Sequence, residues 1–160
     1  MVVMLILAVF STLLTLRIES VFSGGDMRLA GRMIINQFNR LRGEAIYGRT
    51  TQLLTLSIER NVLYSPGRVS GEKESWETDS EQMNNEHRLP AGVELMDVVV
   101  LSQGKIQEGE ATIRFYPNGC IEQSLIHIRN EDQEVYTLEI NPMTGQIELH
   151  DRYIDQKIAP

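Results

Sequence analysis

The side chains that could form a catalytic set are few in this sequence. Ser124 and His127 are three positions apart in an expected strand, and an odd separation on a strand places two side chains on opposite faces. No acidic residue is placed to orient His127, so the pair does not predict a nucleophile with a general base. Cys120 begins an expected strand, which favours a small, partly buried and inert thiol, since a reactive one needs nearby positive charge. We therefore predict no catalytic site and interpret the protein as not an enzyme.

Acidic side chains gather at two places where a metal ion could bind. Asp151 and Asp155 form one group, and Glu131, Asp132 and Glu134 form the other. Neither group has the ligand spacing of an EF-hand loop, so solvated surface carboxylates are the favoured interpretation and calcium ligation is the alternative. The three histidines are scattered along the chain. We expect no metal ion, no other cofactor and no small-molecule substrate.

Charge and composition exclude further classes of protein. The 160 residues carry a formal net charge of −7, whereas a nucleic-acid-binding protein needs a basic surface. A single cysteine rules out an intrachain disulfide. The length allows one compact domain and one additional element.

The N-terminal segment is the additional element. Residues 1–16 contain no charged side chain, and their only polar groups are hydroxyls, which can bond to helix carbonyls in lipid. At about 1.5 Å per residue this run covers about 24 Å, against a hydrocarbon core of about 30 Å. We predict a transmembrane or filament-core helix over residues 1–22, with a cleaved signal peptide or a buried helix of a soluble domain as alternatives. The side chains expected to mediate assembly are Val2, Leu5, Ile6, Val9, Phe10, Leu13 and Leu14.

The helix is expected to change character at a weak point. Gly24 and Gly25 destabilise a helix and form a candidate hinge, with a simple loop between two helices as the alternative. Asp26 is the expected N-cap and Gly48 the expected end of the second helix. Apolar side chains at three- and four-residue spacing, opposite a largely basic and polar face, predict an amphipathic helix over residues 26–48. These apolar side chains are Met27, Ala30, Met33, Ile34, Phe38, Leu41 and Ala45.

Short strands are predicted over residues 51–150. Alternating apolar and polar positions, interrupted by turn residues, indicate six or seven of them. Residues 53–64 are expected to form a hairpin with its turn at 60–61. The Pro-Asn-Gly turn at 117–119 is expected to lead into a return strand at 121–129.

These elements predict an α+β fold. We expect a long N-terminal helix, apolar and then amphipathic, packed on an antiparallel β-sandwich head that comprises residues 23–160. Residues 65–90 are polar and are interpreted as a solvated loop, or alternatively as a partner-binding loop with Trp76 as its contact residue. The tail after Arg152 is expected to be frayed.

Four stretches, in this order, resemble those of a known family. Residues 1–16 are similar to the N-terminal helix of type IV pilins and type II secretion pseudopilins, and residues 41–48 (LRGEAIYG) are similar to their L-x-x-x-R-x-E-A-x-x-x-G helix end. Residues 113–119 (IRFYPNG) resemble their I-x-F-x-P-x-G strand and turn, and residues 138–147 (LEINPMTGQI) resemble their L-x-V-x-x-x-T-G-x-V closing hairpin. The sequence is most similar to H-type minor pseudopilins and the related FimT/FimU-type minor pilins.

The resemblance implies a structural subunit of the type II secretion pseudopilus that assembles through its N-terminal helix and supports protein secretion. It implies a single-pass protein of the bacterial inner membrane with its head in the periplasm and a processed, methylated N terminus. The implied partners are other pseudopilins, the inner membrane and its assembly platform. The alternatives are a minor pilin of a type IV pilus, or a membrane-tethered substrate-binding module that never enters a filament.

The sequence departs from this family at its beginning. The family's Gly-Phe-Thr-Leu-x-Glu processing motif is absent, and Met1 lies a residue or two after the expected position of that glutamate. We therefore expect the codons upstream of Met1 to encode a short basic leader and this motif. An in-frame stop codon immediately upstream would contradict that expectation.

Overall fold

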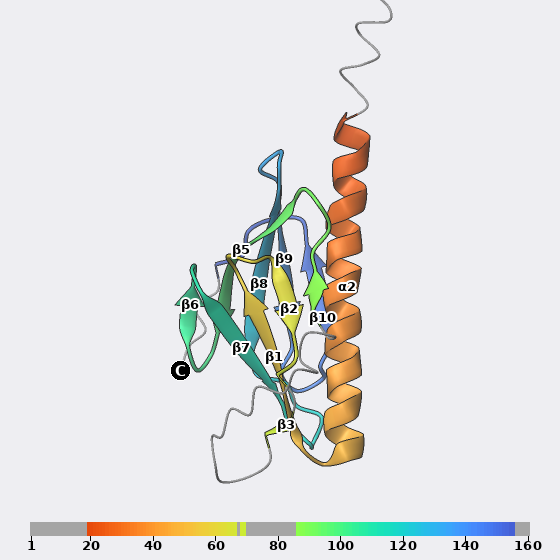
Figure 1. The fold of residues 1–160 in the computed structure, drawn as a ribbon, viewed down its shortest axis with the longest axis vertical. Coiled ribbons are helices and arrows are strands. Elements are labelled where there is room, and N and C mark those ends of the chain that lie inside the picture. The colour runs from red at the N-terminus through yellow and green to blue at the C-terminus, as the bar shows by residue number, and fades with distance from the viewer. Residues whose placement is uncertain (1–18, 67, 70–85, 156–160) are drawn as a thin grey trace, which may run out of the picture.

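The computed structural model describes residues 19–66, 68–69 and 86–155. In these residues a long helix, α2 (Glu19–Gly48), lies along one side of two antiparallel sheets (Figure 1). Ten strands follow it in the described residues. They are β1 (Thr51–Ser57), β2 (Val62–Tyr64), β3 (Arg68–Val69), β4 (His87–Arg88), β5 (Val93–Val100), β6 (Gly104–Ile106), β7 (Glu110–Phe115), β8 (Ser124–Asn130), β9 (Val135–Ile140) and β10 (Ile147–His150).

One face of α2 is buried because its apolar side chains recur every three or four residues. The helix ends at Gly48 as predicted, but it is continuous from Glu19 through Gly24 and Gly25. Asp26 is therefore not an N-cap, and the alternative of a loop between two helices is wrong. Packing of the following turns on the sheets outweighs the cost of helical glycines, about 1 kcal/mol each. The buried side chains are Met27, Ala30, Ile34, Phe38, Leu41 and Ala45.

The first sheet is built around β1. Residues 55–57 of β1 pair with both β7 and β2, so these two strands lie on opposite edges of β1. β3 pairs with the beginning of β1, and β4 pairs with β2. The β1–β2 pairing confirms the hairpin predicted for residues 53–64, and β7 forms an outer strand of this sheet among the described strands.

The second sheet has the strand order β10-β9-β8-β5-β6, and all its neighbours are antiparallel. A register shift between Leu95 and Asp97 marks a bulge in β5. After this bulge, Asp97 lies opposite His127 of β8, whose other neighbour is Thr137 of β9. The bulge therefore sets which polar side chains meet on the outer face of this sheet.

The hydrophobic core lies between α2 and the inner faces of the two sheets. Phe38 of α2 packs against Phe115 of β7 in an edge-on arrangement, with ring centroids 5.1 Å apart. Leu54 of β1 and Ile126 of β8 belong to the same buried cluster, so both sheets contribute to one core. This arrangement confirms the predicted α+β fold, with the helix packed on antiparallel sheets.

The number of strands is larger than predicted. The sequence indicates six or seven strands, and the described residues form ten. Three of them, β3, β4 and β6, are two or three residues long, which is too short to produce an alternating pattern. β3 and β4 lie within residues 65–90, which the sequence predicts to be a loop.

The return strand predicted after the turn at 117–119 is only partly correct. The Tyr116 amide donates to the Cys120 carbonyl at 2.9 Å, so the chain does reverse. It then leaves the first sheet, and β8 begins at Ser124 beside β5 of the second sheet. Turn residues predict a reversal of the chain, but they do not determine which sheet the next strand joins.

Candidate functional site

The residues predicted to mediate assembly lie outside the described part of the chain. This applies to the seven apolar side chains within residues 1–16 and to Trp76, whose roles stay predictions. Gly24 and Gly25 lie within the continuous helix α2, which leaves their proposed bending untested. Among the described residues, no helix combines the length and apolar character needed to cross a membrane.

Three of the stretches that carry the sequence resemblance meet at Arg42. Its Nε donates a hydrogen bond to the Gly119 carbonyl at 2.9 Å, which joins the end of α2 to the turn after β7. A Cβ atom added at Gly145 would lie 2.7 Å from Cζ of Arg42, so the guanidinium also lies directly against the turn between β9 and β10. One arginine thus connects three segments that are far apart in the sequence.

Both turns beside Arg42 require glycine. The backbone φ angle is 84° at Gly119 and 67° at Gly145, a region that residues with a Cβ atom rarely adopt. A Cβ atom at Gly119 would also lie 3.3 Å from Cδ1 of Ile46 on α2. The two glycines therefore allow the turns to approach the last part of the helix closely.

An open pocket of about 390 Å³ lies where the chain passes from the first sheet to the second. Its wall includes an ion pair, in which Arg114 Nη1 lies 3.5 Å from Glu122 Oε2. Glu122 is buried, and its carboxylate also accepts a hydrogen bond from the Arg114 amide at 3.2 Å, so its charge is compensated. The apolar lining residues are Leu101, Tyr116, Ile121 and Pro142. The other lining residues are Ser102, Gln123 and the two members of the ion pair, so the pocket offers both apolar and polar contacts.

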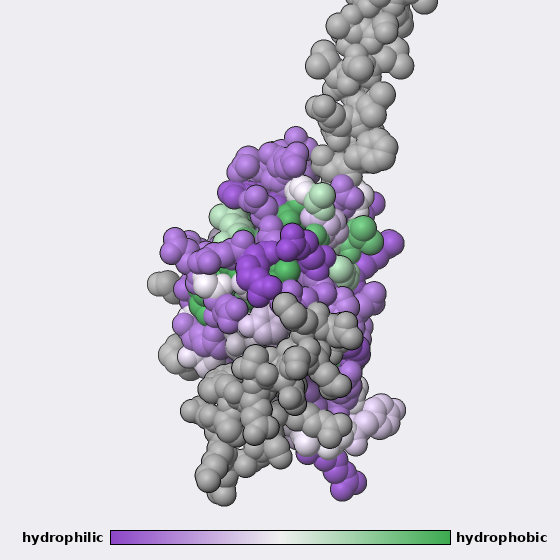
Figure 2. Space-filling model, in the orientation of Figure 1, coloured by the Kyte–Doolittle hydropathy of each residue, from purple (hydrophilic) through white to green (hydrophobic). Residues whose placement is uncertain are grey.

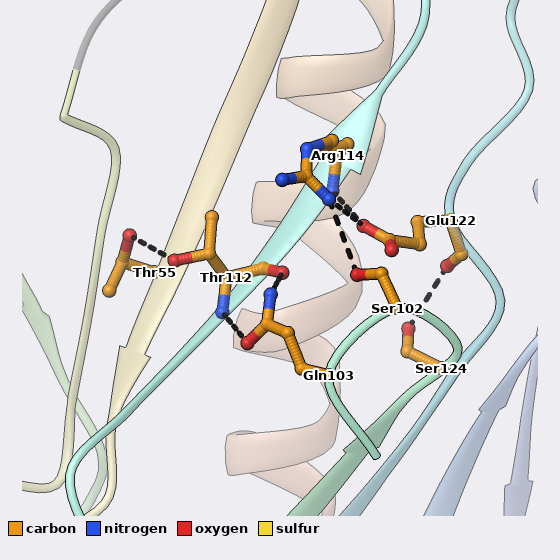
Figure 3. A network of polar contacts seen from close by, with 7 residues as sticks. All are labelled: Thr55, Ser102, Gln103, Thr112, Arg114, Glu122 and Ser124. Carbon is orange, nitrogen blue, oxygen red and sulfur yellow. Dashed lines mark hydrogen bonds and ion pairs between the residues drawn. The ribbon is translucent and has the colours of Figure 1, made fainter. Parts of the chain in front are cut away.

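The outer edge of β7 is covered by side chains from the turn between β5 and β6. Gln103 Nε2 donates to the Thr112 carbonyl at 2.7 Å, and Gln103 Oε1 accepts from the Thr112 amide at 3.3 Å (Figure 3). This pair of bonds reproduces the hydrogen bonding of a neighbouring strand. Arg114 Nη1 donates to Ser102 Oγ at 3.3 Å beside it. The edge is thus joined to the second sheet and protected from pairing with another chain.

A buried pair of titratable side chains connects β5 and β8. His127 Nδ1 lies 2.6 Å from Asp97 Oδ1, and neither side chain is exposed. The expectation that no acid orients His127 is therefore wrong, because the bulge in β5 places Asp97 opposite it. Burial alone would raise the pKa of Asp97, but the hydrogen bond and charge of His127, together with Lys105 and Tyr153, lower it below its ordinary value.

Residues 151–155, which we call the strap, cross the outer face of the second sheet over this pair. His127 Nε2 lies 3.0 Å from the Ile154 carbonyl oxygen, and the Tyr153 ring stacks on the imidazole with centroids 4.0 Å apart. The Thr137 hydroxyl donates to a strap carbonyl at 2.7 Å and accepts from the Ile154 amide at 3.1 Å. The prediction of a frayed end after Arg152 is wrong for residues 153–155, because the contacts of Tyr153 and Ile154 hold them in place.

The polar pair is not arranged for acid–base chemistry on a bound molecule. Both ring nitrogens of His127 contact oxygen atoms of the protein, and the buried ring leaves no position for a substrate proton. The Ser124 hydroxyl instead donates to the Glu122 carbonyl at 3.3 Å, in agreement with its predicted separation from His127. Cys120 is partly exposed, in line with the expected partly buried thiol.

The acidic side chains considered as metal ligands form two separate groups, one at Glu131, Asp132 and Glu134 and one at Asp151 and Asp155. Glu134 accepts a hydrogen bond from the Asn130 side-chain amide at 2.9 Å, and Asp151 and Asp155 are exposed at the two ends of the strap. In the part of the chain that the structure describes, no group of three potential metal-binding side chains lies close enough to hold an ion. The interpretation of these side chains as solvated carboxylates stays a prediction.

The face of the head seen in Figure 2 is mainly hydrophilic, with apolar side chains exposed at separate places. Two of the most exposed apolar side chains belong to elements that Arg42 joins. Tyr47, in the last turn of α2, is 91% exposed, and Met143, in the turn that contacts Arg42, is 76% exposed. Amphipathic tyrosine and flexible methionine side chains are common at protein interfaces, so this end of the head is a candidate docking surface.

A long helix packed along two antiparallel sheets that share one core defines a pilin-like class of fold. The crystal structure of the minor pseudopilin EpsH from the type II secretion system of Vibrio cholerae is similar to it, with a TM-score of 0.58 and 15% sequence identity over 82% of this chain and 98% of that chain. A second structure of EpsH gives a TM-score of 0.54 and 16% identity over 78% of this chain and 95% of that chain. No family model and no curated protein matches the sequence. The chain thus has the fold of a minor pseudopilin.

The sequence alone does not reveal the Asp97–His127 pair or the strap. One signal is present: Asp97 interrupts the apolar run from Leu95 to Val100 in β5. A carboxylate in a central strand needs a buried partner, because an unpaired buried charge is very costly. The identity of that partner depends on the bulge, which has no recognisable pattern in the sequence.

Proposed function

We propose that this protein is a minor pilin-like subunit of a type II secretion pseudopilus that supports protein secretion without catalysis. The observation that carries the proposal is the likeness to EpsH over 82% of this chain and 98% of that chain. The apolar segment at residues 1–16, directly before α2, supports it, because such a segment suits both a membrane and a filament core.

In this proposal, residues 1–22 hold the subunit in the bacterial inner membrane and the head lies in the periplasm. On assembly, the apolar helix leaves lipid and packs against the helices of other pseudopilins. Both surroundings are apolar, so the exchange costs little hydrophobic free energy, and packing and charge pairing decide its direction. Methylation of a processed N terminus and contact with the assembly platform belong to the same proposal.

The head supplies docking surfaces to neighbouring subunits. The exposed side chains Tyr47 and Met143, and the pocket between the two sheets, offer apolar contacts for partner subunits. Arg42 stabilises the end of α2 against two turns, so these surfaces keep a fixed position relative to the helix. A rigid connection of this kind suits a subunit whose place in a filament is set by its helix.

The proposal is tested by secretion in the native host. We expect deletion of the gene to reduce the amount of type II secreted enzymes in the medium, and the full-length gene to restore it. Val9→Asp places a carboxylate within the apolar segment and should abolish this restoration, since a charge in the centre of a membrane helix costs about 3 kcal/mol or more. The control is Thr12→Val, which keeps the segment apolar and should restore secretion.

The same strains separate the alternatives. Normal secretion with a loss of surface pili after deletion would overturn the proposal in favour of a type IV pilus subunit. Lost secretion, combined with a head that never forms cysteine crosslinks to other pseudopilins, would instead indicate a membrane-tethered binding module. A deletion strain with normal secretion and normal pili would exclude both filament roles.

A further inference from the structure

One side of α2 is not covered by the sheets of the head. The helix packs on them with the face that carries Met27 and Phe38, and its opposite side faces away from both sheets (Figure 1). At 3.6 residues per turn, the exposed side chains opposite the buried face lie along one side of the helix, and we call them the outer row. They are Arg28, Leu29, Arg32, Asn36, Asn39, Arg40, Ile46 and Tyr47.

The outer row carries positive charge. Arg28 and Arg32 form no ion pair with any residue whose side chain the structure describes. Arg40 is compensated by Glu44, whose Oε1 lies 3.7 Å from Arg40 Nε. Asp26 is two positions before Arg28, and side chains at this spacing do not face each other on a helix. Two guanidinium groups, which stay charged at every physiological pH, are therefore available to an anionic partner.

Apolar side chains are exposed within the same row. Leu29 is 55% exposed and lies between Arg28 and Arg32 in the sequence. Ile46 and Tyr47 are exposed in the last turn of the helix. Arginine and tyrosine can rest an apolar body against lipid while their polar tips stay in water. A helix side that combines such residues with exposed leucine suits the interface of a membrane.

The position of the outer row favours lipid over an acidic protein surface. This inference rests on the proposed function, in which residues 1–22 lie in a membrane. Along the helix, Arg28 is about 9 Å and Arg32 about 15 Å beyond residue 22. Attraction to an anionic surface extends over about 8–10 Å, so Arg28 experiences it even when the head is upright. A bend at Gly24 and Gly25 would bring the rest of the row to the same surface.

Two observations make a second copy of this chain a poorer partner. Each copy has a formal net charge of −7, so two copies repel each other overall. The row also lies on the convex surface of a helix, and no residue of α2 lines the pocket between the two sheets. A bilayer surface adapts to such a convex row, whereas a protein partner must match its shape.

We propose that, before assembly, the head rests on the anionic surface of the bilayer that holds it, with the outer row of α2 against the lipid headgroups. The acidic turn between β8 and β9, which contains Glu131 and Asp132, lies at the same end of the head but on the side of the sheets (Figure 1). Its repulsion from an anionic bilayer turns the head the same way. Because Tyr47 belongs to the row, lipid and a neighbouring subunit compete for it.

The charges set the size of the effect. Each basic side chain held near an anionic bilayer multiplies the binding constant by about fivefold. Arg28 and Arg32 together therefore favour the resting position over the upright one by about 30-fold. Exposed charges are screened by salt, so this preference should disappear at about 1 M salt, where the Debye length is about 3 Å.

Quenching by acrylamide of a fluorophore in the outer row tests the resting position. The fluorophore is attached through Asn36→Cys in the full chain, with the single native cysteine removed by Cys120→Ser. The chain is reconstituted into vesicles of phosphatidylcholine, alone or mixed with phosphatidylglycerol. Acrylamide is uncharged, so its access reports cover by lipid and not the charge of the bilayer. Quenching should be weaker in the anionic vesicles and should return to the neutral level at about 1 M salt.

Matched variants test which charges are responsible. Arg28→Gln, Arg32→Gln should be quenched equally in both kinds of vesicle. Arg129→Gln, Arg152→Gln is the control, because it removes the same charge from the second sheet and the strap. It should keep the protection in anionic vesicles. Loss of protection in both double variants would overturn the assignment of the outer row.

The remaining outcomes separate this inference from the proposed function. Equal quenching in neutral and anionic vesicles overturns the inference and leaves the proposed function in place. Protection in neutral vesicles that grows with the ratio of protein to lipid would show a second copy on the outer row, and it overturns the inference as well. A chain that does not float with neutral vesicles in a density gradient would overturn the membrane role proposed for residues 1–22, and this inference with it.

Discussion

At the scale of single residues, the guanidinium of Arg42 limits what its neighbouring turns can carry. It donates to the Gly119 carbonyl and occupies the space that a Cβ atom of Gly145 would need. The positive φ angles of the two glycines already disfavour other residues. Backbone strain and side-chain overlap are separate effects, and the chain offers positions at which they can be measured separately.

Gly145→Ala should lower the free energy of unfolding by about 2–4 kcal/mol, the sum of the left-handed backbone cost and overlap with Arg42. Gly104→Ala is the matched control, because Gly104 has a φ angle of 78° but no atom within 4 Å of an added Cβ. This control should lose only about 1–2 kcal/mol. Urea unfolding measures both variants, and equal losses would contradict the contact of Gly145 with Arg42.

At the scale of elements, β7 shows how one side chain takes the place of a strand. The Gln103 amide satisfies both the N–H and the C=O of Thr112, which otherwise face outward at the sheet edge. Unpaired edges of this kind are templates for association with other chains. In a protein whose proposed role is ordered assembly, a covered edge reduces assembly at the wrong place.

Gln103→Ala should uncover the Thr112 backbone and permit pairing of β7 edges between molecules. We expect a stability loss of about 1–2 kcal/mol and self-association that increases with protein concentration, measured by analytical ultracentrifugation. Gln107→Ala, at an exposed glutamine between β6 and β7, should remain like the unaltered protein. If Gln103→Ala is as monomeric as Gln107→Ala at the highest concentrations, edge protection by Gln103 is wrong.

The elements that sequence analysis predicts well are those with a long, regular pattern. Apolar spacing of three and four residues predicts the helix α2. Alternation predicts the strands β1 and β7, and an apolar run predicts the strand β5. The shorter β3, β4 and β6 form because a neighbouring strand is available for pairing, which is tertiary information. Helix continuity at Gly24 and Gly25 is likewise decided by packing beyond the glycines.

The candidate sites are harder to predict than the elements. Asp97 and His127 are 30 residues apart in the sequence and meet because of the register of β5 against β8 after a bulge. A shift of register by one residue would place each on the other face of the sheet. Arg42, in contrast, lies within a stretch that resembles a family motif, so the sequence indicated its region but not the turns that it contacts.

At the scale of the whole molecule, α2 connects the head to the segment proposed to lie in a membrane. The helix is continuous over residues 19–48, and Met27 is the first buried side chain among helix residues 25–48. Gly24 and Gly25 precede Met27, so bending at the two glycines would leave the packing of Met27 and the buried residues after it in place. In the proposed transfer from membrane to filament, the role predicted for these glycines is to let the helix bend at this position.

The double variant Gly24→Ala, Gly25→Ala should stabilise the helical conformation by about 1 kcal/mol per site. It should therefore reduce secretion if the helix must bend during transfer. Gly43→Ala is the control, since Gly43 is also helical and no atom lies within 4 Å of an added Cβ. It should stiffen the helix within the head and leave secretion unchanged. Normal incorporation of the double variant into pseudopili, measured by crosslinking, would refute the hinge.

The strap has a consequence for biosynthesis. It leaves the ribosome after all ten described strands, so the nascent chain can pair both sheets before residues 151–155 arrive. Until then, Asp97 and His127 lack the cover of the strap, and Asp97 has His127 and Lys105 as its partners. A product that stops before residue 151 would thus keep its strands but expose this face to proteases, so finished and unfinished heads would differ in their sensitivity to proteolysis.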